Sequence, residues 1–227
     1  MSQIDEVFLK DKYLDLPYRI YIPKNPIKLF VFLHGAGERG DDNTLHIITN
    51  NTLLKKLVSN ELTSNNFIVL APHCYNTDKW CNYQLIDENY SLDYDKIPLS
   101  KPLREAKELI ELIQERYHID SNSTIIEGLS MGGLGTLALS RRFNLAKKYI
   151  SICGAGDLYY TSNYKNKEFL LFHGTKDPVI NYNCSLKFSE MLNKNKIKNE
   201  LVLYEGFGHD SWTSAHDSDL IFDFITK

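Results

Sequence analysis

The segment that most constrains this chain is the stretch from Thr124 to Gly135. Three residues of high strand propensity lead into Gly-Leu-Ser-Met-Gly at 128–132, and a Gly- and Leu-rich segment typical of a helix follows. A serine on such a sharp strand-to-helix turn is held in strained backbone space, so its hydroxyl stands clear of the sheet beside the positive end of the helix. The flanking glycines remove side chains that would collide in so tight a turn. Ser130 is therefore a candidate nucleophile.

Strand and helix patterns alternate through the rest of the chain. Nearly continuous apolar runs predict strands at 27–33, 67–71, 124–126, 149–153, 169–172 and 201–204. Apolar residues at helical spacing predict helices at 49–59, 100–117, 179–193 and 214–225, besides the helix after Ser130. Apolar runs without alternation indicate strands that are buried on both faces. We therefore expect an α/β fold, with a mostly parallel central sheet and helices on both faces.

The N-terminal segment predicts a strand pair of a different kind. Strand formers at 7–9 and 18–22 flank the polar residues Lys10 to Lys12, which we expect to form the turn of an antiparallel pair. Pro17 and Pro23 indicate edge strands, where a missing N–H is tolerated.

Two helix starts and one long connection also stand out. Ser100 is expected to cap a helix with Pro102 in its first turn, and Ser214 with Asp217 resembles a capping box for the final helix. Residues 73–100 form a polar connection of a length that is usually functional or disordered. Its many aromatic side chains favour an ordered loop.

A serine hydroxyl needs a base within hydrogen-bond reach, and the base needs a third group to orient it. Loops that follow parallel strands meet at one edge of the sheet, so the partners of Ser130 should lie just after strands. Asp177 follows one predicted strand and precedes a proline that restricts its backbone. His209 follows the last predicted strand, on a loop with two glycines. The order serine, acid, histidine is that of the α/β-hydrolases.

Four motifs carry a resemblance to a known family. Gly-Leu-Ser-Met-Gly-Gly, His-Gly-Thr-Lys-Asp-Pro-Val and Gly-Phe-Gly-His together resemble an α/β-hydrolase of the esterase type. The segment Leu-His-Gly-Ala-Gly-Glu-Arg-Gly at 33–40 is similar to small bacterial carboxylesterases grouped with feruloyl esterases and polyhydroxybutyrate-depolymerase-like proteins. The resemblance covers residues 20–225. It implies an α/β-hydrolase fold, and the short distance from the Ser130 helix to Asp177 argues against a large lid.

The resemblance also implies roles for the three residues. Ser130 attacks an ester carbonyl, His209 takes its proton and later protonates the leaving alcohol, and Asp177 orients the imidazole.

The developing oxyanion needs preorganised N–H donors. By the same resemblance, one donor is the backbone amide of Met131. The other comes from the loop that follows residues 27–33, with Ala36 first and Gly37 as the fallback.

Several neighbouring residues offer alternatives. Asp157 follows the preceding strand and could supply the acid instead. His216 is a rival for the base, although we expect it to face solvent on the final helix. Asp210 is expected to be a loop or capping residue. His34 and His173 each precede a glycine at a strand end, and we expect both to be structural.

The cluster His73, Cys74, Asp78 and Cys81 is dense enough to suggest a metal site. Its spacing lacks Cys-x-x-Cys and has no second pair downstream, so we expect no structural zinc and no metal. Cys74 and Cys81 could pair only if the protein is exported.

The substrate pocket is expected to involve Gly37, Glu38 and Trp80. Trp80 either lines the pocket or anchors its loop, and the sequence leaves both open. Glu38 and Arg39 are expected to order the loop or to pair with each other.

Composition limits the classes of partner. A chain of 227 residues that is 43% hydrophobic is expected to form one domain over residues 1–227. The net charge of −3 without a basic run disfavours nucleic acid and anionic membranes as partners. The acidic first residues lack the order of a signal peptide, so a cytoplasmic location is expected, with export after signal removal left open. The oligomeric state leaves no signal in the sequence.

These observations predict a serine hydrolase that cleaves small or soluble carboxylic esters through an acyl-enzyme and needs no cofactor. One alternative is a serine peptidase of the prolyl-oligopeptidase type, disfavoured because the propeller domain of that type is absent. Another is a binding protein on a hydrolase scaffold, disfavoured because the triad is intact.

Overall fold

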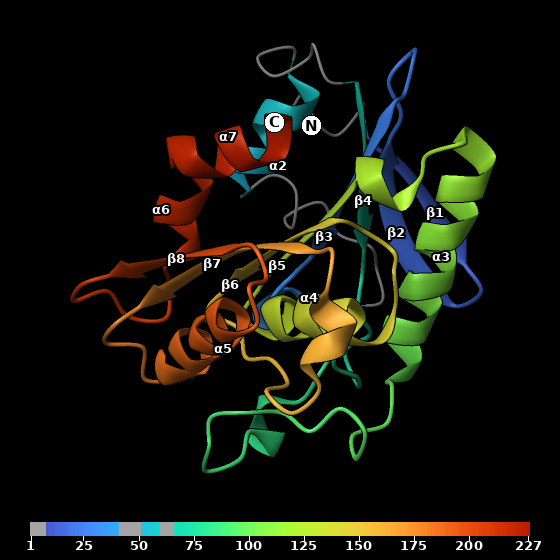
Figure 1. Ribbon diagram of the computed structural model, residues 1–227. Coiled ribbons are helices and arrows are strands. Elements are labelled where there is room, and N and C mark those ends of the chain that lie inside the picture. The colour runs from blue at the N-terminus through green and yellow to red at the C-terminus, as the bar shows by residue number, and fades with distance from the viewer. Residues whose placement is uncertain (1–7, 41–50, 60–65) are drawn as a thin grey trace.

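Eight strands form one sheet in the computed structural model, which describes residues 8–40, 51–59 and 66–227. The strands are β1 Leu9–Tyr13, β2 Leu16–Tyr21, β3 Lys28–Leu33, β4 Phe67–Pro72, β5 Thr124–Leu129, β6 Lys148–Ile152, β7 Glu168–Gly174 and β8 Asn199–Tyr204. Their order across the sheet is β1-β2-β4-β3-β5-β6-β7-β8 (Figure 1). The β1–β2 and β2–β4 pairs are antiparallel, and the pairs from β4 through β3 to β8 are parallel. The predicted mostly parallel sheet with antiparallel N-terminal strands is confirmed.

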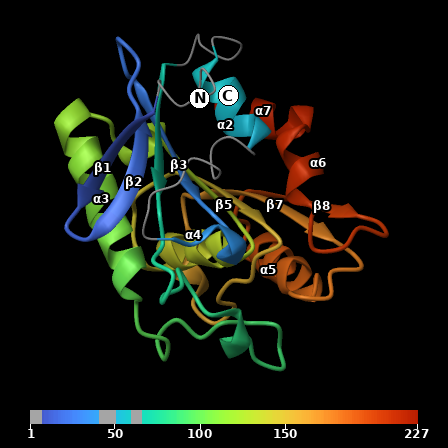
Figure 2. The ribbon, with the colours of Figure 1, turned by 180° about the vertical axis from the view of Figure 1, so that it is seen from behind.

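Helices cover both faces of the sheet. They are α2 Thr52–Val58, α3 Lys101–Tyr117, α4 Met131–Arg142, α5 Asn183–Lys194, α6 Trp212–His216 and α7 Asp219–Thr226. Helices α3, α4 and α5 lie on one face, and α2, α6 and α7 lie on the other (Figures 1 and 2). Alternate residues of β3 divide between the two apolar cores, with Val31 and Leu33 facing the first set of helices and Phe30 and Phe32 facing the second. This double burial explains why the strand lacks polar alternation.

The N-terminal turn was predicted at the wrong place. Lys10 to Lys12 lie inside β1, where they pair with Arg19 to Pro17 of β2, and the chain reverses at residues 14–15. The polar run is tolerated because β1 is the exposed edge of the sheet. The edge assignment of Pro17 is also wrong, since β2 has neighbours on both sides. Pro17 stays near the strand end, and its carbonyl accepts the His73 amide at 2.8 Å.

Two predicted helices have different bounds in the structure. The helix expected at 179–193 begins only at Asn183, because the carboxylate of Asp177 accepts the amides of Val179 and Ile180 and holds this loop in another conformation. The final segment forms two helices instead of one. Ser218, and not Ser214, caps the second of them by accepting the amide of Leu220 at 3.2 Å.

Two further predicted helices, α2 and α3, are present in the structure. The helix expected at 49–59 is α2, which Asn51 caps, while residues 49–50 lie outside the described residues. Helix α3 is capped as predicted, with the hydroxyl of Ser100 accepting the amide of Leu103 at 3.3 Å.

The long connection at 73–100 is fastened to the sheet face that carries α4. The hydroxyl of Tyr94 donates to the carbonyls of Leu134 and Ala155, and the guanidinium of Arg142 donates to the carbonyls of Tyr94 and Ile97. Between α4 and Asp177, residues 143–176 contain only β6, β7 and one short 3-10 turn, so no helical lid is inserted there.

Candidate active site

Ser130 occupies the turn between β5 and α4 in a strained conformation. Its backbone angles are φ 52° and ψ −119°, a region that costs a residue with a side chain about 1–3 kcal/mol. Two hydrogen bonds hold it there: its amide donates to the carbonyl of Ile152 at 2.8 Å, and its carbonyl accepts the amide of Leu134 at 3.1 Å. The strained turn predicted from the sequence is therefore present.

The two glycines of the pentapeptide are required by close backbone contact. A Cβ atom on Gly128 would lie 2.3 Å from the carbonyl oxygen of Gly132. A Cβ atom on Gly132 would lie 1.8 Å from the carbonyl oxygen of Leu33, at the end of β3. The first turn of helix α4 thus lies in direct contact with the end of β3. This contact places the start of the helix beside the loop that follows β3.

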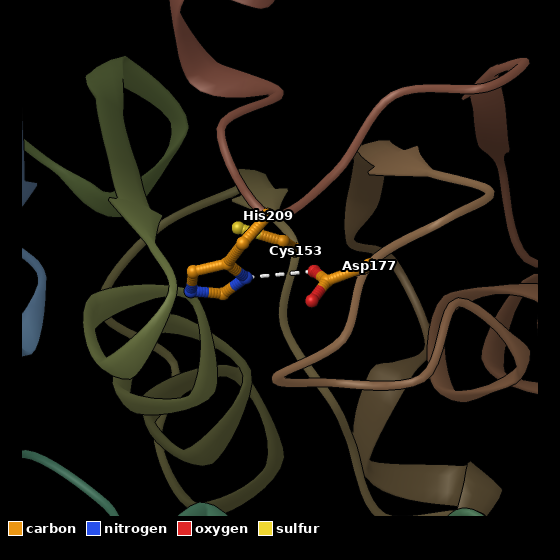
Figure 3. Close-up of side chains that lie close together, drawn as sticks. All are labelled: Cys153, Asp177 and His209. Carbon is orange, nitrogen blue, oxygen red and sulfur yellow. Dashed lines mark hydrogen bonds and ion pairs between the residues drawn. The ribbon is translucent and has the colours of Figure 1, made fainter.

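His209 joins Ser130 to Asp177. The Nε2 atom of His209 is 2.8 Å from Oγ of Ser130. Its Nδ1 atom is 2.7 Å from Oδ2 of Asp177 (Figure 3). A carboxylate only accepts, so Nδ1 carries the hydrogen and Nε2 is left to accept the serine hydroxyl. The three residues come from the ends of β5, β7 and β8, which lie on one edge of the sheet as the sequence predicts.

Asp177 is held as a carboxylate by several donors. Burial raises its pKa, but hydrogen bonds from His173 and His209 and from the amides of Ile180 and Val179 hold the pKa of Asp177 well below its usual range. The side chain is fully buried, and the two amides donate to Oδ1 at 2.8 and 3.0 Å. The carboxylate is therefore fixed in place and remains charged at neutral pH.

His173 was predicted to be structural, and its ring contacts helix α5 and the loop that precedes this helix. Its Nδ1 atom is 2.7 Å from Oγ of Ser185, and its Nε2 atom is 2.9 Å from the carbonyl of Ile180. A third contact was not predicted: Nε2 lies 3.2 Å from Oδ2 of Asp177.

The loop after β3 forms a 3-10 turn, Ala36–Glu38, beside Ser130. The carboxylate of Glu38 accepts the amide of Gly35 at 2.8 Å, while Nε of Arg39 donates to the carbonyl of Ala36 at 2.9 Å. The guanidinium also donates to carbonyls of the 73–100 loop. Glu38 and Arg39 thus order the loop, each through its own partners.

Burial raises the pKa of Glu38, and the hydrogen bond from the Gly35 amide opposes that shift without cancelling it. The carboxylate is one of several polar groups near Ser130.

A cavity of about 670 Å³ opens beside Ser130. Its lining includes the β3 loop, the start of α4, part of the 73–100 loop and residues of α6. The lining residues are Phe32, Gly35, Ala36, Gly37, Glu38, Asn51, Lys79, Cys81, Tyr83, Leu129, Ser130, Met131, Val179, His209, Trp212 and His216. Gly37 and Glu38 lie in the cavity wall, where the sequence placed them.

Trp80 does not line this cavity. Its side chain is buried, and its Nε1 atom donates to the carbonyl of His34 at 3.1 Å. The imidazole of His34 in turn accepts the amide of Cys74 at 2.9 Å. Of the two roles left open for Trp80, the structure supports that of an anchor for the 73–100 loop, because its side chain packs against Gly135 of α4.

The rival residues are committed elsewhere. Asp157 is buried, accepts the amides of Tyr94 and Tyr159, and lies 3.3 Å from Nε of Arg141. Asp210 accepts the amide and hydroxyl of Thr213 at the start of α6, which fits the capping role.

The prediction for His216 was wrong. Only 3% of the residue is exposed, and its Nε2 atom is 2.5 Å from Oε1 of Glu127. Helix α6 turns this side chain inward against β5 instead of toward solvent. Glu127 was missed altogether, although a charged residue in the apolar strand just before Gly128 was an available signal.

The structure offers one group of possible metal ligands within the described ranges. Ligand atoms of Cys153, Asp177 and His209 all lie within 4.8 Å of one another (Figure 3). Asp177 and His209 already bind each other, and burial raises the pKa of Cys153 well above its usual range, which keeps the thiol protonated. Neither Cys74 nor Cys81 belongs to this group, and both are buried free thiols.

No helix in the described part of the chain is long and apolar enough to cross a membrane.

Comparison with solved structures finds several hydrolases that share this fold. A thermostable esterase is 30% identical with a TM-score of 0.86, and the match covers 97% of this chain and 62% of that one, so this chain spans less than two thirds of the esterase's length. A ferulic acid esterase is 14% identical with a TM-score of 0.65, covering 96% of each chain. An acylaminoacyl peptidase of Pyrococcus horikoshii is 16% identical with a TM-score of 0.64, covering 97% of this chain and 41% of that one. The last two show the fold alone.

A search of the curated proteins finds no match. Residues 20–225 match the phospholipase/carboxylesterase family, the same range over which the sequence motifs resemble esterases. The chain therefore belongs to the phospholipase/carboxylesterase family of α/β-hydrolases.

Proposed function

We propose that this protein is a serine esterase in which Ser130, His209 and Asp177 form the catalytic triad. The observation that carries the proposal is the continuous hydrogen-bonded chain from Oγ of Ser130 through His209 to Oδ2 of Asp177, with distances of 2.8 and 2.7 Å. This is the arrangement that a serine nucleophile needs, because the base must accept its proton as the bond to carbon forms.

In the acylation step, Oγ of Ser130 attacks the ester carbonyl and its proton passes to Nε2 of His209. The tetrahedral intermediate then collapses, the bond to the alcohol oxygen breaks, and the imidazolium returns the proton to that oxygen. Asp177 stabilises the imidazolium and keeps the ring oriented.

In the deacylation step, a water molecule takes the place of the alcohol. His209 accepts one of its protons while the water oxygen attacks the acyl carbon. Collapse of the second intermediate breaks the bond to Ser130, which regains its proton, and the carboxylic acid leaves.

The oxyanion of both intermediates is bound by the backbone amides of Met131 and Ala36, with Gly37 as the alternative to Ala36. Met131 begins α4, so its amide is one of the donors that have no partner within the helix. All three residues line the cavity beside Ser130. Donors fixed in advance are worth about 2.7–4 kcal/mol each in such sites.

Labelling with a fluorophosphonate probe tests the nucleophile. The probe should modify the wild-type protein at Ser130 and leave Ser130→Ala unlabelled. A panel of p-nitrophenyl esters, run beside proline-containing peptide amides, then separates esterase from peptidase. Faster cleavage of the amides would favour a peptidase of the prolyl-oligopeptidase type, and absence of labelling with no turnover would favour a binding protein. Esterase turnover by Ser130→Ala near the wild-type rate would disprove the assignment.

A further inference from the structure

The cavity beside Ser130 also has polar lining residues that do not belong to the triad. Asn51, at the N-terminus of α2, and His216, in α6, both line the cavity, and they are only 4% and 3% exposed. The two helices pack against each other, and an ion pair of 3.4 Å between Lys56 and Asp217 joins them. Buried polar groups in a ligand cavity usually determine which ligand fits.

Asn51 presents an unpaired hydrogen-bond donor. Its Oδ1 atom accepts the amide of Leu54 at 3.0 Å, and this bond decides which end of the side-chain amide is the oxygen. The Nδ2 atom is buried and has no hydrogen-bond partner among the described residues. A buried donor in this state costs about 1–3 kcal/mol, which a ligand acceptor would recover.

His216 presents the complementary acceptor. Its Nε2 atom bonds Oε1 of Glu127, and because a carboxylate only accepts, the hydrogen is on Nε2. In the neutral ring, Nδ1 is then an acceptor, and no hydrogen bond within the described ranges uses it. An edge contact with Phe32, with ring centroids 6.4 Å apart, holds the plane of the imidazole.

A hydroxyl group is both a donor and an acceptor, so its chemistry matches the donor of Asn51 and the acceptor of His216. An unsubstituted aliphatic chain in the same place would leave both unpaired, and a site with unpaired buried polar groups rejects such a ligand. We propose that Asn51 and His216 form a subsite that binds a hydroxyl group carried by the ester substrate. This inference rests on the proposed esterase function and specifies the class of ester.

The experiment compares matched pairs of esters. Monobutyrin and propyl butyrate differ by hydroxyls on the alcohol side, and ethyl 3-hydroxybutyrate and ethyl butyrate differ by one on the acyl side. The wild-type enzyme should prefer the hydroxylated member of at least one pair by about tenfold or more in kcat/KM. The ratio is taken within one enzyme sample, so partial loss of folded protein does not affect it.

Asn51→Ser tests the donor. Serine can still cap α2, but its shorter side chain lacks the Nδ2 donor of asparagine. The preference should fall to about twofold or less. Asn163→Ser is the matched control, since Asn163 also donates through its amide, to the carbonyl of Arg141 at 3.0 Å, but lies outside the cavity lining. The control should keep the wild-type preference.

A double variant tests the acceptor. Glu127→Leu with His216→Phe removes the ring nitrogen without leaving a buried carboxylate unpaired, and the preference should again disappear. The proposal is overturned if the wild-type enzyme hydrolyses these esters without a preference, or if Asn51→Ser keeps it. Hydrolysis of none of the four esters would overturn the esterase function itself.

Discussion

His173 contacts the carboxylate of Asp177: its Nε2 atom lies 3.2 Å from Oδ2, the same oxygen that receives Nδ1 of His209. The carboxylate of Asp177 is therefore held by two histidines. The contact from His173 helps to fix the position of the oxygen that accepts the hydrogen bond from His209. Replacing His173 by alanine removes one hydrogen bond to a charged group, worth about 1.5–3 kcal/mol.

We expect His173→Ala to lower kcat at least about tenfold while leaving KM nearly unchanged, since the ring does not line the cavity. Steady-state kinetics on a p-nitrophenyl ester, well below the unfolding temperature, measure this split. His173→Gln retains a donor at the place of Nε2 and should recover much of the rate. An equal loss in both variants would point to a purely structural role.

The strain at Ser130 predicts a gain in stability at the expense of activity. Ser130→Gly and Ser130→Ala both lose the nucleophile, but only glycine tolerates φ 52° and ψ −119° without a clash. Relief of about 1–3 kcal/mol of strain exceeds the roughly 0.5–1 kcal/mol that glycine costs through the unfolded chain. The glycine variant should therefore unfold a few degrees above the alanine variant in calorimetry. Equal unfolding temperatures would mean that the turn stores no strain.

Much of the fold could be predicted from the sequence because its strongest signals are local. Strands β3, β4 and β7 carry apolar side chains on both faces, and that property is visible in the sequence as uninterrupted apolar runs. Ser130, Asp177 and His209 could be identified because each follows a strand in a parallel sheet, so topology alone brings them to one edge.

The errors arise where long-range contacts decide the outcome. The segment at 212–226 has a continuous helical pattern, but Ser218 divides it, and the burial of His216 depends on Glu127, 89 residues away in the chain. The start of α5 is delayed by the carboxylate of Asp177. The position of Trp80 depends on a carbonyl in another loop. Contacts between residues so far apart in the chain cannot be predicted from the periodicity of the sequence.

The contact between α4 and β3 predicts a difference between two glycines. In Gly132→Ala, the new Cβ would lie 1.8 Å from the carbonyl oxygen of Leu33, so strand and helix must separate. We expect a loss of more than about 4 kcal/mol in the free energy of unfolding, and little soluble protein. Gly37 has nothing within 4 Å of a built Cβ, so Gly37→Ala should change the stability by about 0.5 kcal/mol or less. Urea unfolding of the two variants checks this, and comparable losses would refute the packing argument.

The raised pKa of Glu38 predicts how stability depends on pH. Burial favours its neutral form, so the folded protein binds this proton more tightly than the unfolded chain does. Its contribution to stability is therefore present at low pH and is lost as pH rises through the raised pKa. Glutamine has no such titration, so the unfolding temperature of Glu38→Gln relative to wild type should rise between pH 4 and pH 8.

Glu168 is the matched control because its shift has the opposite sign. Burial raises its pKa, but the ammonium groups of Lys198 and Lys147 outweigh this and lower it. A lowered pKa stabilises the folded state above the ordinary value, and this stability is lost as pH falls through the lowered pKa. The unfolding temperature of Glu168→Gln relative to wild type should therefore fall as pH rises from about 3 to about 5, and stay level at higher pH. Differential scanning fluorimetry from about pH 3 to pH 8 measures both trends. Parallel trends in the two variants would show that the change follows the overall net charge and not the surroundings of Glu38.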